Sequence, residues 1–343
     1  MIVTVTPAPA IDWTVWVEHF QLGRVNRTER STREPSGKGV NISWALHRAG
    51  VPTRAVLPAG GATGSFMAEQ FARAGVPHVI MDTGRDVRTN ITLITRGQPT
   101  KINEPGSPLS PDELESFRQV IHEAARGVAT VVLCGRLPPG VPNEFMRDVA
   151  VALKESGVEV VVDTSGAALR RALEACPDLI KPNVNELAEL AGFPIRTFGD
   201  VVRASRGARD RGAGAVLASL GVDGAVLVDA AGELYARADD VPLVNPVGAG
   251  DAFLAGYLVG GQAVERLTRA TLWAASAVAH PTTLFPIREE FAERISVGPV
   301  PDPKRRLAEP SHIRTGDRSW RAGRLPSTSV DPPRPPQAVG PDA

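Results

Sequence analysis

The chain has 343 residues with 38 basic and 38 acidic side chains, so its formal net charge is zero and an extended nucleic-acid-binding surface is disfavoured. A hydrophobic content of 43% with 22% charged residues is ordinary for a globular protein. Two cysteines, no signal-peptide pattern and no long apolar run lead us to expect a cytoplasmic protein that does not associate with membranes.

Short β-rich runs alternate with longer helical patterns along most of the chain. Ser110 as N-cap and Pro111 at the first helical position mark the clearest helix start. Strands are predicted at 2–6, 53–57, 78–81, 128–133 and 158–162, and helices at 41–49, 65–74, about 112–125 and 143–154. This alternation predicts an α/β fold of three layers, α/β/α, with a mostly parallel sheet.

Two stretches interrupt the alternation of strands and helices. Residues 12–33 and 88–101 each read as antiparallel strands without a helical partner. Together they suggest a small β-sheet, with limits near 12–35 and 88–103, that stands off the main sheet. Such a sheet could act as a lid over a ligand or pair with a second subunit in a homodimer. Ordinary edge hairpins explain the pattern equally well.

The C-terminal region differs from the rest of the chain. Residues 299–343 contain ten of the 30 prolines, together with arginine, serine and glycine, and show no periodicity. Because such a segment buries too little apolar surface to offset its ordering entropy, we predict a disordered Pro/Arg-rich tail. The predicted folded unit is therefore residues 1–298.

The strongest local signal for chemistry is the run Gly248-Ala249-Gly250-Asp251, which precedes an apolar helix. Small residues allow a ligand to approach the backbone, and the amides of a helix N-terminus attract anions. A carboxylate beside such an anion hole suits phosphoryl transfer to a hydroxyl group. A glycine-rich turn with a capping Asp251 is the simpler alternative. Neither GxxxxGK[ST] nor GxGxxG occurs.

Further motifs occur in a fixed order over about residues 1–280. They are Pro9-Ala10-Ile11-Asp12, Ser36-Gly37-Lys38-Gly39-Val40-Asn41, Arg88-Thr89-Asn90, Lys101-Ile102-Asn103-Glu104-Pro105-Gly106, Gly135-Arg136-Leu137-Pro138-Pro139-Gly140, Lys181-Pro182-Asn183-Val184-Asn185-Glu186-Leu187 and Ser219-Leu220-Gly221-Val222-Asp223-Gly224. With the GAGD run, this set resembles the ribokinase-like (pfkB) family of sugar kinases, and within it the hexose-phosphate kinases.

The resemblance implies a reaction and its alternatives. It implies an ATP-dependent, Mg²⁺-requiring kinase that converts a ketohexose monophosphate into a bisphosphate. Fructose 1-phosphate is the first choice of substrate, followed by tagatose 6-phosphate and fructose 6-phosphate. The alternatives are a kinase for an unphosphorylated sugar or nucleoside and, outside the enzymes, a sugar-phosphate sensor.

On the donor side, the resemblance assigns roles residue by residue. Asp251 corresponds to the catalytic base, and Gly248, Ala249 and Gly250 to the anion hole. ATP binding is implied for Lys181, Asn183, Ser219, Gly221 and Gly224. Asn183 and Glu186 are implied to act on magnesium through water, although the same spacing also fits a helix capping box, and both can hold together.

On the acceptor side, Asp12, Gly37, Asn41 and Asn90 are implied to bind the sugar. Lys38, Arg88 and Lys101 come from three separate segments and are expected to converge on the sugar phosphate. Only five of the 38 basic residues are lysines, so two lysines within these motifs strengthen that reading.

Three residues depart from the family pattern. Ala8 replaces an asparagine, and Ser36 replaces the first glycine of a hinge-like pair, which we expect to stiffen lid closure. Arg136 replaces a small serine and either adds a cation beside the phosphate pocket or is exposed on the surface.

Overall fold

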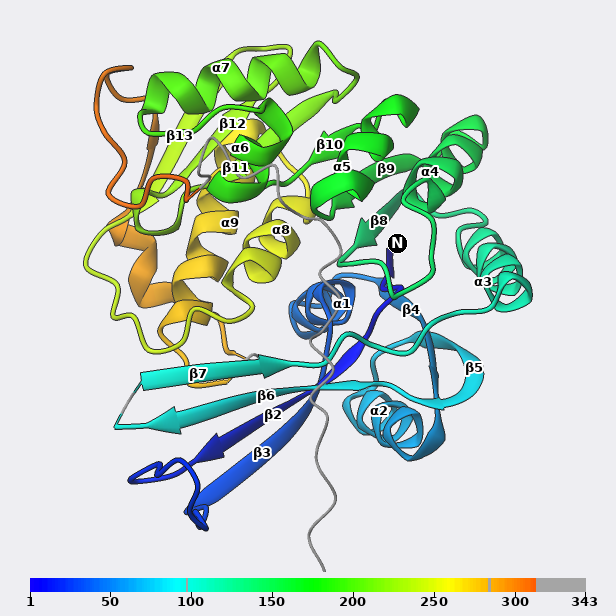
Figure 1. The fold of residues 1–343 in the computed structure, drawn as a ribbon. Coiled ribbons are helices and arrows are strands. Elements are labelled where there is room, and N and C mark those ends of the chain that lie inside the picture. The colour runs from blue at the N-terminus through cyan, green and yellow to red at the C-terminus, as the bar shows by residue number, and fades with distance from the viewer. Residues whose placement is uncertain (97, 283–284, 313–343) are drawn as a thin grey trace, which may run out of the picture. The chain divides into compact units, whose positions relative to one another are not determined.

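The computed structural model describes residues 1–96, 98–282 and 285–312, in which ten strands form the main sheet (Figure 1). The strand order is β14-β13-β12-β11-β10-β9-β8-β1-β4-β5, parallel from β11 to β5 and antiparallel from β11 to β14. The strands are β1 (Ile2–Val5), β4 (Thr53–Gly60), β5 (His78–Asp86), β8 (Thr130–Cys134), β9 (Glu159–Asp163), β10 (Leu179–Ile180), β11 (Ala215–Ser219), β12 (Ala225–Val228), β13 (Glu233–Ala238) and β14 (Ile295–Gly298).

Helices cover both faces of this sheet. On one face lie α1 (Lys38–Arg48), α2 (Gly61–Ala74), α8 (Ala249–Leu258) and α9 (Ala263–Val278). On the other lie α3 (Pro111–Ala124), α4 (Phe145–Glu155), α5 (Gly166–Ala172), α6 (Val184–Ala191) and α7 (Phe198–Arg209). Short 3₁₀ turns are η1 (Leu173–Ala175), η2 (Gly221–Asp223) and η3 (Glu289–Arg294). The three-layer α/β/α prediction is confirmed.

The central strands are buried as their apolar sequences predict. The strand segment Thr130–Cys134 is buried at every position, as expected of a parallel strand covered on both sides. Its successive residues Val131 and Val132 belong to the cores on opposite faces of the sheet. At α3, Ser110 forms a capping box with Glu113 behind Pro111, which confirms the predicted helix start.

A second sheet of four strands, here called the lid sheet, has the order β3-β2-β6-β7. Its strands are β2 (Ala10–Trp16), β3 (Arg30–Ser36), β6 (Arg88–Thr95) and β7 (Gln98–Asn103). The pairs β2–β3 and β6–β7 are antiparallel as predicted, and β2–β6 joins them in parallel. Since β2 follows β1 and β6 follows β5, the lid sheet rises from the carboxyl ends of main-sheet strands, where α/β proteins bind ligands (Figure 1).

Residues 299–312, here called the C-terminal strap, pack against the preceding part of the chain. Leu307 is only 6% exposed, and the amide of Phe198 donates to the carbonyl of Arg305 at 3.1 Å. The predicted boundary at residue 298 is therefore wrong for this stretch, because its apolar and backbone groups find partners that the composition of the whole tail conceals. Residues 313–343 of the predicted tail lie outside the described residues.

Over the part of the chain that the structure describes, no helix is long and apolar enough to cross a membrane.

Candidate active site

The start of α1 lies unusually close to the end of β1. A Cβ atom on Gly37, whose φ is +125°, would lie 2.7 Å from Thr6 Cγ2, and a Cβ on Gly39 would collide with Thr6 Oγ1. These glycines therefore allow the helix to begin against the strand end. As a result, Lys38 and Asn41 occupy the first turn of α1, at the carboxyl edge of the sheet.

Asp251 is held in the first turn of α8, which begins after Gly248 with φ +79°. The side chain is buried, and Asn41 Nδ2 donates to Asp251 Oδ2 at 2.8 Å. Burial, and then the charge of Asp163, raise the pKa of Asp251 to about 6. A carboxylate poised in this range is mostly ionised at neutral pH and can still accept a proton.

Asp163 is a site residue that we did not predict. It ends β9, is fully buried, and receives Lys38 Nζ at 2.6 Å and Lys181 Nζ at 3.2 Å on its two oxygens. Burial alone would raise its pKa, but Lys181 and Lys38 outweigh burial, so the pKa of Asp163 is lowered. An aspartate that ends a buried strand was the available signal, because parallel strands meet at this edge.

Lys38 forms ion pairs with acidic side chains of the site. Its ammonium lies 2.6 Å from Asp163 Oδ1 and 3.6 Å from Glu186 Oε1, so Lys38 forms ion pairs with two carboxylates. Burial opposes the charged form, but Asp163, Glu186 and Asp251 raise the pKa of Lys38. Among the described residues, Lys38 thus belongs to the buried charge cluster around Asp163, and its convergence with Arg88 and Lys101 on a sugar phosphate stays a prediction.

The predicted nucleotide residues lie along the adjoining strand ends. The side-chain oxygen of Asn183 accepts from the amides of Asn185 and Glu186 at 2.9 Å, and Glu186 Oε2 accepts from the Asn183 amide, so the capping box is confirmed. The Ser219 amide donates to the Pro182 carbonyl at 3.0 Å, which brings the two motifs together. The turn η2 begins at Gly221 and is followed by Gly224, and both glycines have positive φ.

Lys181 connects this region with the GAGD run. Its buried ammonium lies 3.5 Å from where a Cβ on Gly250 would stand. At the start of α8, the amides of Asp251 and Ala252 turn back to the Gly248 carbonyl at 3.1 and 2.8 Å. The Gly250 backbone and the Lys181 ammonium therefore lie close together at a helix N-terminus, which suits a phosphate group.

Asp12 is oriented by two neighbours on the lid sheet. Ser36 Oγ donates to Asp12 Oδ2 at 2.7 Å, and Asn90 Nδ2 donates to Asp12 Oδ1 at 2.9 Å. Ser36, a departure from the family pattern, thus supplies a hydrogen bond that glycine cannot.

Among the described residues, Asn90 Oδ1 and Arg88 Nε are buried without a hydrogen-bond partner. Buried polar atoms in this state are expected where a ligand binds.

Arg88 lies near Arg136. Both line a cleft of about 350 Å³ with Asn103 and Glu104. Burial lowers the pKa of Arg88, and the charge of Arg136 lowers it further. Arg136 is exposed, as one of the two alternatives stated for it expected, and its role beside a phosphate pocket stays a prediction. Lys101 is exposed farther along the lid sheet, opposite Thr92.

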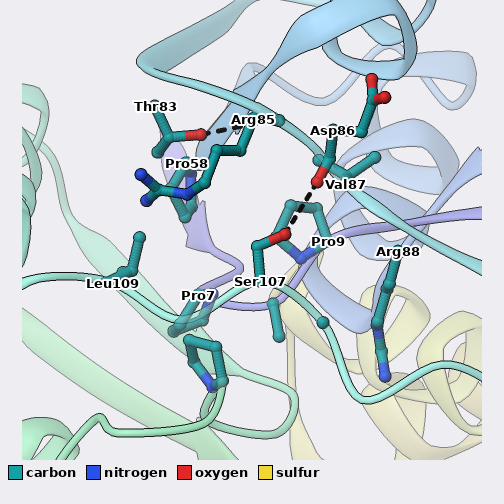
Figure 2. Close-up of a pocket in the computed structure, with 13 residues that line it drawn as sticks. Pro7, Pro9, Pro58, Thr83, Arg85, Asp86, Val87, Arg88, Ser107 and Leu109 are labelled. Carbon is teal, nitrogen blue, oxygen red and sulfur yellow. Dashed lines mark hydrogen bonds between the residues drawn. The ribbon is translucent and has the colours of Figure 1, made fainter.

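The junction between the main sheet and the lid sheet separates Arg88 from its neighbour Arg85. Figure 2 shows the two side chains leaving this junction in different directions. Arg85 pairs with Glu113 at 2.7 Å on the surface. Ala8 lies between Pro7 and Pro9 and lines a small pocket beside Arg85 and Arg88. Arg88, and not Arg85, therefore lines the cleft that Arg136 also lines.

The profile of pfkB family carbohydrate kinases matches residues 5–290, most of the chain. The chain belongs to the pfkB family of carbohydrate kinases. A 1-phosphofructokinase of Bacillus subtilis (strain 168) is 35% identical to this kinase over 260 residues, covering 76% of this chain and 85% of its own. A 1-phosphofructokinase of Rhodobacter capsulatus is also 35% identical over 260 residues, covering 75% and 82%.

Solved structures agree with the fold of this kinase. Phosphofructokinase-2 from Escherichia coli, in complex with substrates and products, superimposes with a TM-score of 0.80 at 28% identity, covering 85% of this chain and 97% of that one. As a pfkB carbohydrate kinase, the chain is a phosphotransferase with an alcohol group as acceptor, and kinases of this family use ATP, generally with Mg²⁺.

The residues present fit a magnesium ion shared with a nucleotide. The described residues contain no group of three or more His, Cys, Asp or Glu that could hold a metal by themselves. Mg²⁺ usually binds one or two carboxylates, together with water and substrate phosphates. Glu186 Oε1, which lies outside the capping box, suits that role, whereas the Asn183 oxygen already accepts two amides.

Proposed function

We propose that this kinase transfers the γ-phosphoryl group of ATP to a ketohexose monophosphate, with fructose 1-phosphate as the preferred acceptor and fructose 1,6-bisphosphate as the product. The observation that carries the proposal is the pairing of a buried base, Asp251, with a separate arginine pair, Arg88 and Arg136, beside a cleft. The names of the 1-phosphofructokinase relatives support this choice over tagatose 6-phosphate and fructose 6-phosphate.

The arginine pair supports a phosphorylated acceptor. Two like charges that lie close together are costly unless an anion pairs with them. A sugar phosphate supplies such an anion, and guanidinium groups bind phosphate oxygens with paired hydrogen bonds. Lys101, exposed on the same face of the lid sheet as Asn90, would add a longer-range attraction at the rim.

Asp251 would perform the proton transfer. The acceptor hydroxyl oxygen forms a bond to the γ-phosphorus, the bond from that phosphorus to the ADP oxygen breaks, and the hydroxyl proton moves to Asp251 Oδ1. The hydrogen bond from Asn41 occupies Oδ2 and fixes the orientation of the carboxylate. The Gly248–Gly250 backbone and Lys181 would stabilise charge on the transferred group.

Asp12, held by Ser36 and Asn90, would accept hydrogen bonds from the sugar hydroxyls. Glu186 would hold magnesium through water, and Lys38 would keep Asp163 and Glu186 compatible with nearby phosphates. When bound, the magnesium ion supplies positive charge that neutralises the phosphates. Ser219, Gly221 and Gly224 would contact the rest of ATP.

A panel of acceptors tests the proposal. ADP release would be measured with fructose 1-phosphate, tagatose 6-phosphate, fructose 6-phosphate, fructose and ribose. We expect kcat/KM to be highest for fructose 1-phosphate. Comparable turnover of free sugars would contradict the phosphate assignment. Binding of sugar phosphates without any ADP release would instead favour the sensor, in which a buried Asp251 would have no purpose.

We also propose that two copies of this kinase pair through their lid sheets. Strand alternation places Trp13, Val15, Ile91 and Leu93 on the face opposite Asp12 and Asn90, and Ile102, on the same apolar face, is 57% exposed. Light scattering should give the mass of a dimer for the full chain, and Ile102→Glu should shift it toward a monomer. A monomeric wild-type chain at micromolar concentration would contradict this pairing.

A further inference from the structure

The C-terminal strap lies against two motifs that the proposed function assigns to the nucleotide. The carboxylate of Asp223 in η2 accepts from the amides of Ala308 and Glu309 at 2.7 and 3.2 Å. The amide of His312 donates to Asn185 Oδ1 at 2.9 Å, within the motif that begins α6. One segment thus contacts both motifs.

The strap is anchored independently of these loops. The Gly199 amide donates to the Pro303 carbonyl at 2.9 Å, and the Leu307 amide donates to the Arg196 carbonyl at 2.9 Å. Ser311 exchanges two hydrogen bonds with the backbone of Ile195, at 2.9 and 3.0 Å. The strap therefore has a defined path of its own as it reaches η2.

Glu309 occupies a particular place on that path. One oxygen of its carboxylate, Oε2, lies where a Cβ on Gly221 would stand, in contact with the loop backbone. Within the described residues, no hydrogen bond or ion pair involves this carboxylate. The absence of a side chain at Gly221 therefore makes room for Glu309 as well as permitting the positive φ of +61°.

The strand order indicates which part of a nucleotide would meet Glu309. Asp163 ends β9, Lys181 follows β10, and Gly221 follows β11, and these three strands are neighbours. Neighbouring strands lie about 4.8 Å apart, so the end of β11 is about 10 Å from the end of β9. A nucleotide with its γ-phosphate beside Asp251 and Asp163 would then bring its nucleoside to Gly221.

We infer that Glu309 of the C-terminal strap accepts hydrogen bonds from the ribose hydroxyls of the bound nucleotide. The inference rests on the proposed ATP site and adds to it a contact from a segment outside the region that the family profile matches, residues 5–290. Carboxylates suit a ribose diol because hydroxyl groups donate and the ionised side chain only accepts. The strap thus makes the kinase selective for ribonucleotides.

Full-length Glu309→Ala and Glu309→Gln variants test the inference, with Glu155→Gln, an exposed carboxylate at the end of α4, as the matched control. The measurements are the Kd of ADP, 2′-deoxy-ADP and 3′-deoxy-ADP by calorimetry and the KM of ATP and the sugar phosphate. We expect Glu309→Ala to raise the Kd of ADP about 10-fold. The Kd of at least one of the two deoxy analogues should be the same in the variant and in the wild type. The sugar-phosphate KM and the control should stay unchanged.

The outcomes separate this inference from the proposed function. If ADP binds the wild type and Glu309→Ala changes neither its affinity nor the ratio to the deoxy analogues, the inference fails while the kinase proposal stands. If ADP binding shows the predicted selectivity but no sugar phosphate is phosphorylated, the proposed acceptor fails and the inference stands. A wild type that binds no ADP overturns both.

Discussion

Asn41 Nδ2 donates a 2.8 Å hydrogen bond to Asp251 Oδ2, although the two residues are 210 positions apart. The contact joins the first turns of α1 and α8, so the segment expected to bind the sugar and the segment expected to bind phosphate meet at one carboxylate. A base in this position can be reached by both substrates, and its surroundings determine when it is ionised.

Replacing Asp251 by asparagine should remove the base and preserve the shape of the site. We expect kcat to fall about 10²- to 10⁴-fold, as for loss of a general base, while the Kd of ADP changes less than about twofold. Steady-state ADP release and calorimetry measure these quantities. Turnover above a hundredth of the wild-type value would show that Asp251 is not the base.

The activity of the wild type should depend on pH through Asp251. Because the pKa of Asp251 is raised to about 6, the protonated, inactive form accumulates as pH falls through that value. The hydrogen bond from Asn41 favours the ionised form, so Asn41→Ala should move the midpoint of the acid limb to a higher pH. Profiles of kcat from pH 5 to 8 measure this shift; an unmoved midpoint would assign the limb to another group.

The free energy of unfolding should change with pH in the direction opposite to the activity. A carboxyl whose pKa is higher in the folded protein destabilises the fold when it is ionised, so the cost is present above about pH 6 and declines as pH falls toward the unfolded value. Asp251→Asn should therefore raise the free energy of unfolding at pH 8 by up to about 3 kcal/mol. Paired melting curves at pH 8 and pH 4.5 should show the larger gain at pH 8; equal gains would contradict the raised pKa.

Ser36 should act through Asp12 rather than on the substrate directly. Its hydroxyl holds Asp12 Oδ2 at 2.7 Å, so Ser36→Ala should raise the KM for the sugar phosphate about 3- to 10-fold and leave the KM for ATP unchanged. Ser205→Ala, at a buried serine of α7, is the matched control. A parallel rise in both KM values would indicate a general structural effect.

Local patterns predicted much of the fold and part of the site. The N-cap at Ser110, the capping box at Asn183 and the position of Asp251 at the start of α8 each depend on a few neighbouring residues, and all three occur as expected. The partners of Lys38 did not follow from its motif, because Asp163 lies 125 positions away. Pairing between distant strand ends decides such contacts, and no single segment contains that information.

The strap shows a second reason why the structure differs from the sequence-based prediction. Its prolines and charges resemble those of the residues that follow, so average composition predicted disorder for all of residues 299–343. Specific hydrogen bonds to the backbone of residues 195–199 and burial of Leu307 outweigh that composition over residues 299–312.

In the proposed function, Arg88 and Arg136 select a phosphorylated acceptor for the base Asp251. The most direct measurement is the ratio of kcat/KM for fructose 1-phosphate to that for fructose, in the wild type, in Arg88→Ala and in the surface control Arg85→Ala. We predict a wild-type ratio of at least about 10³ and a fall of about 10- to 100-fold in that ratio for Arg88→Ala only. Equal turnover of the two sugars by the wild type, or an unchanged ratio in Arg88→Ala, would contradict the selection of a phosphorylated acceptor by these arginines.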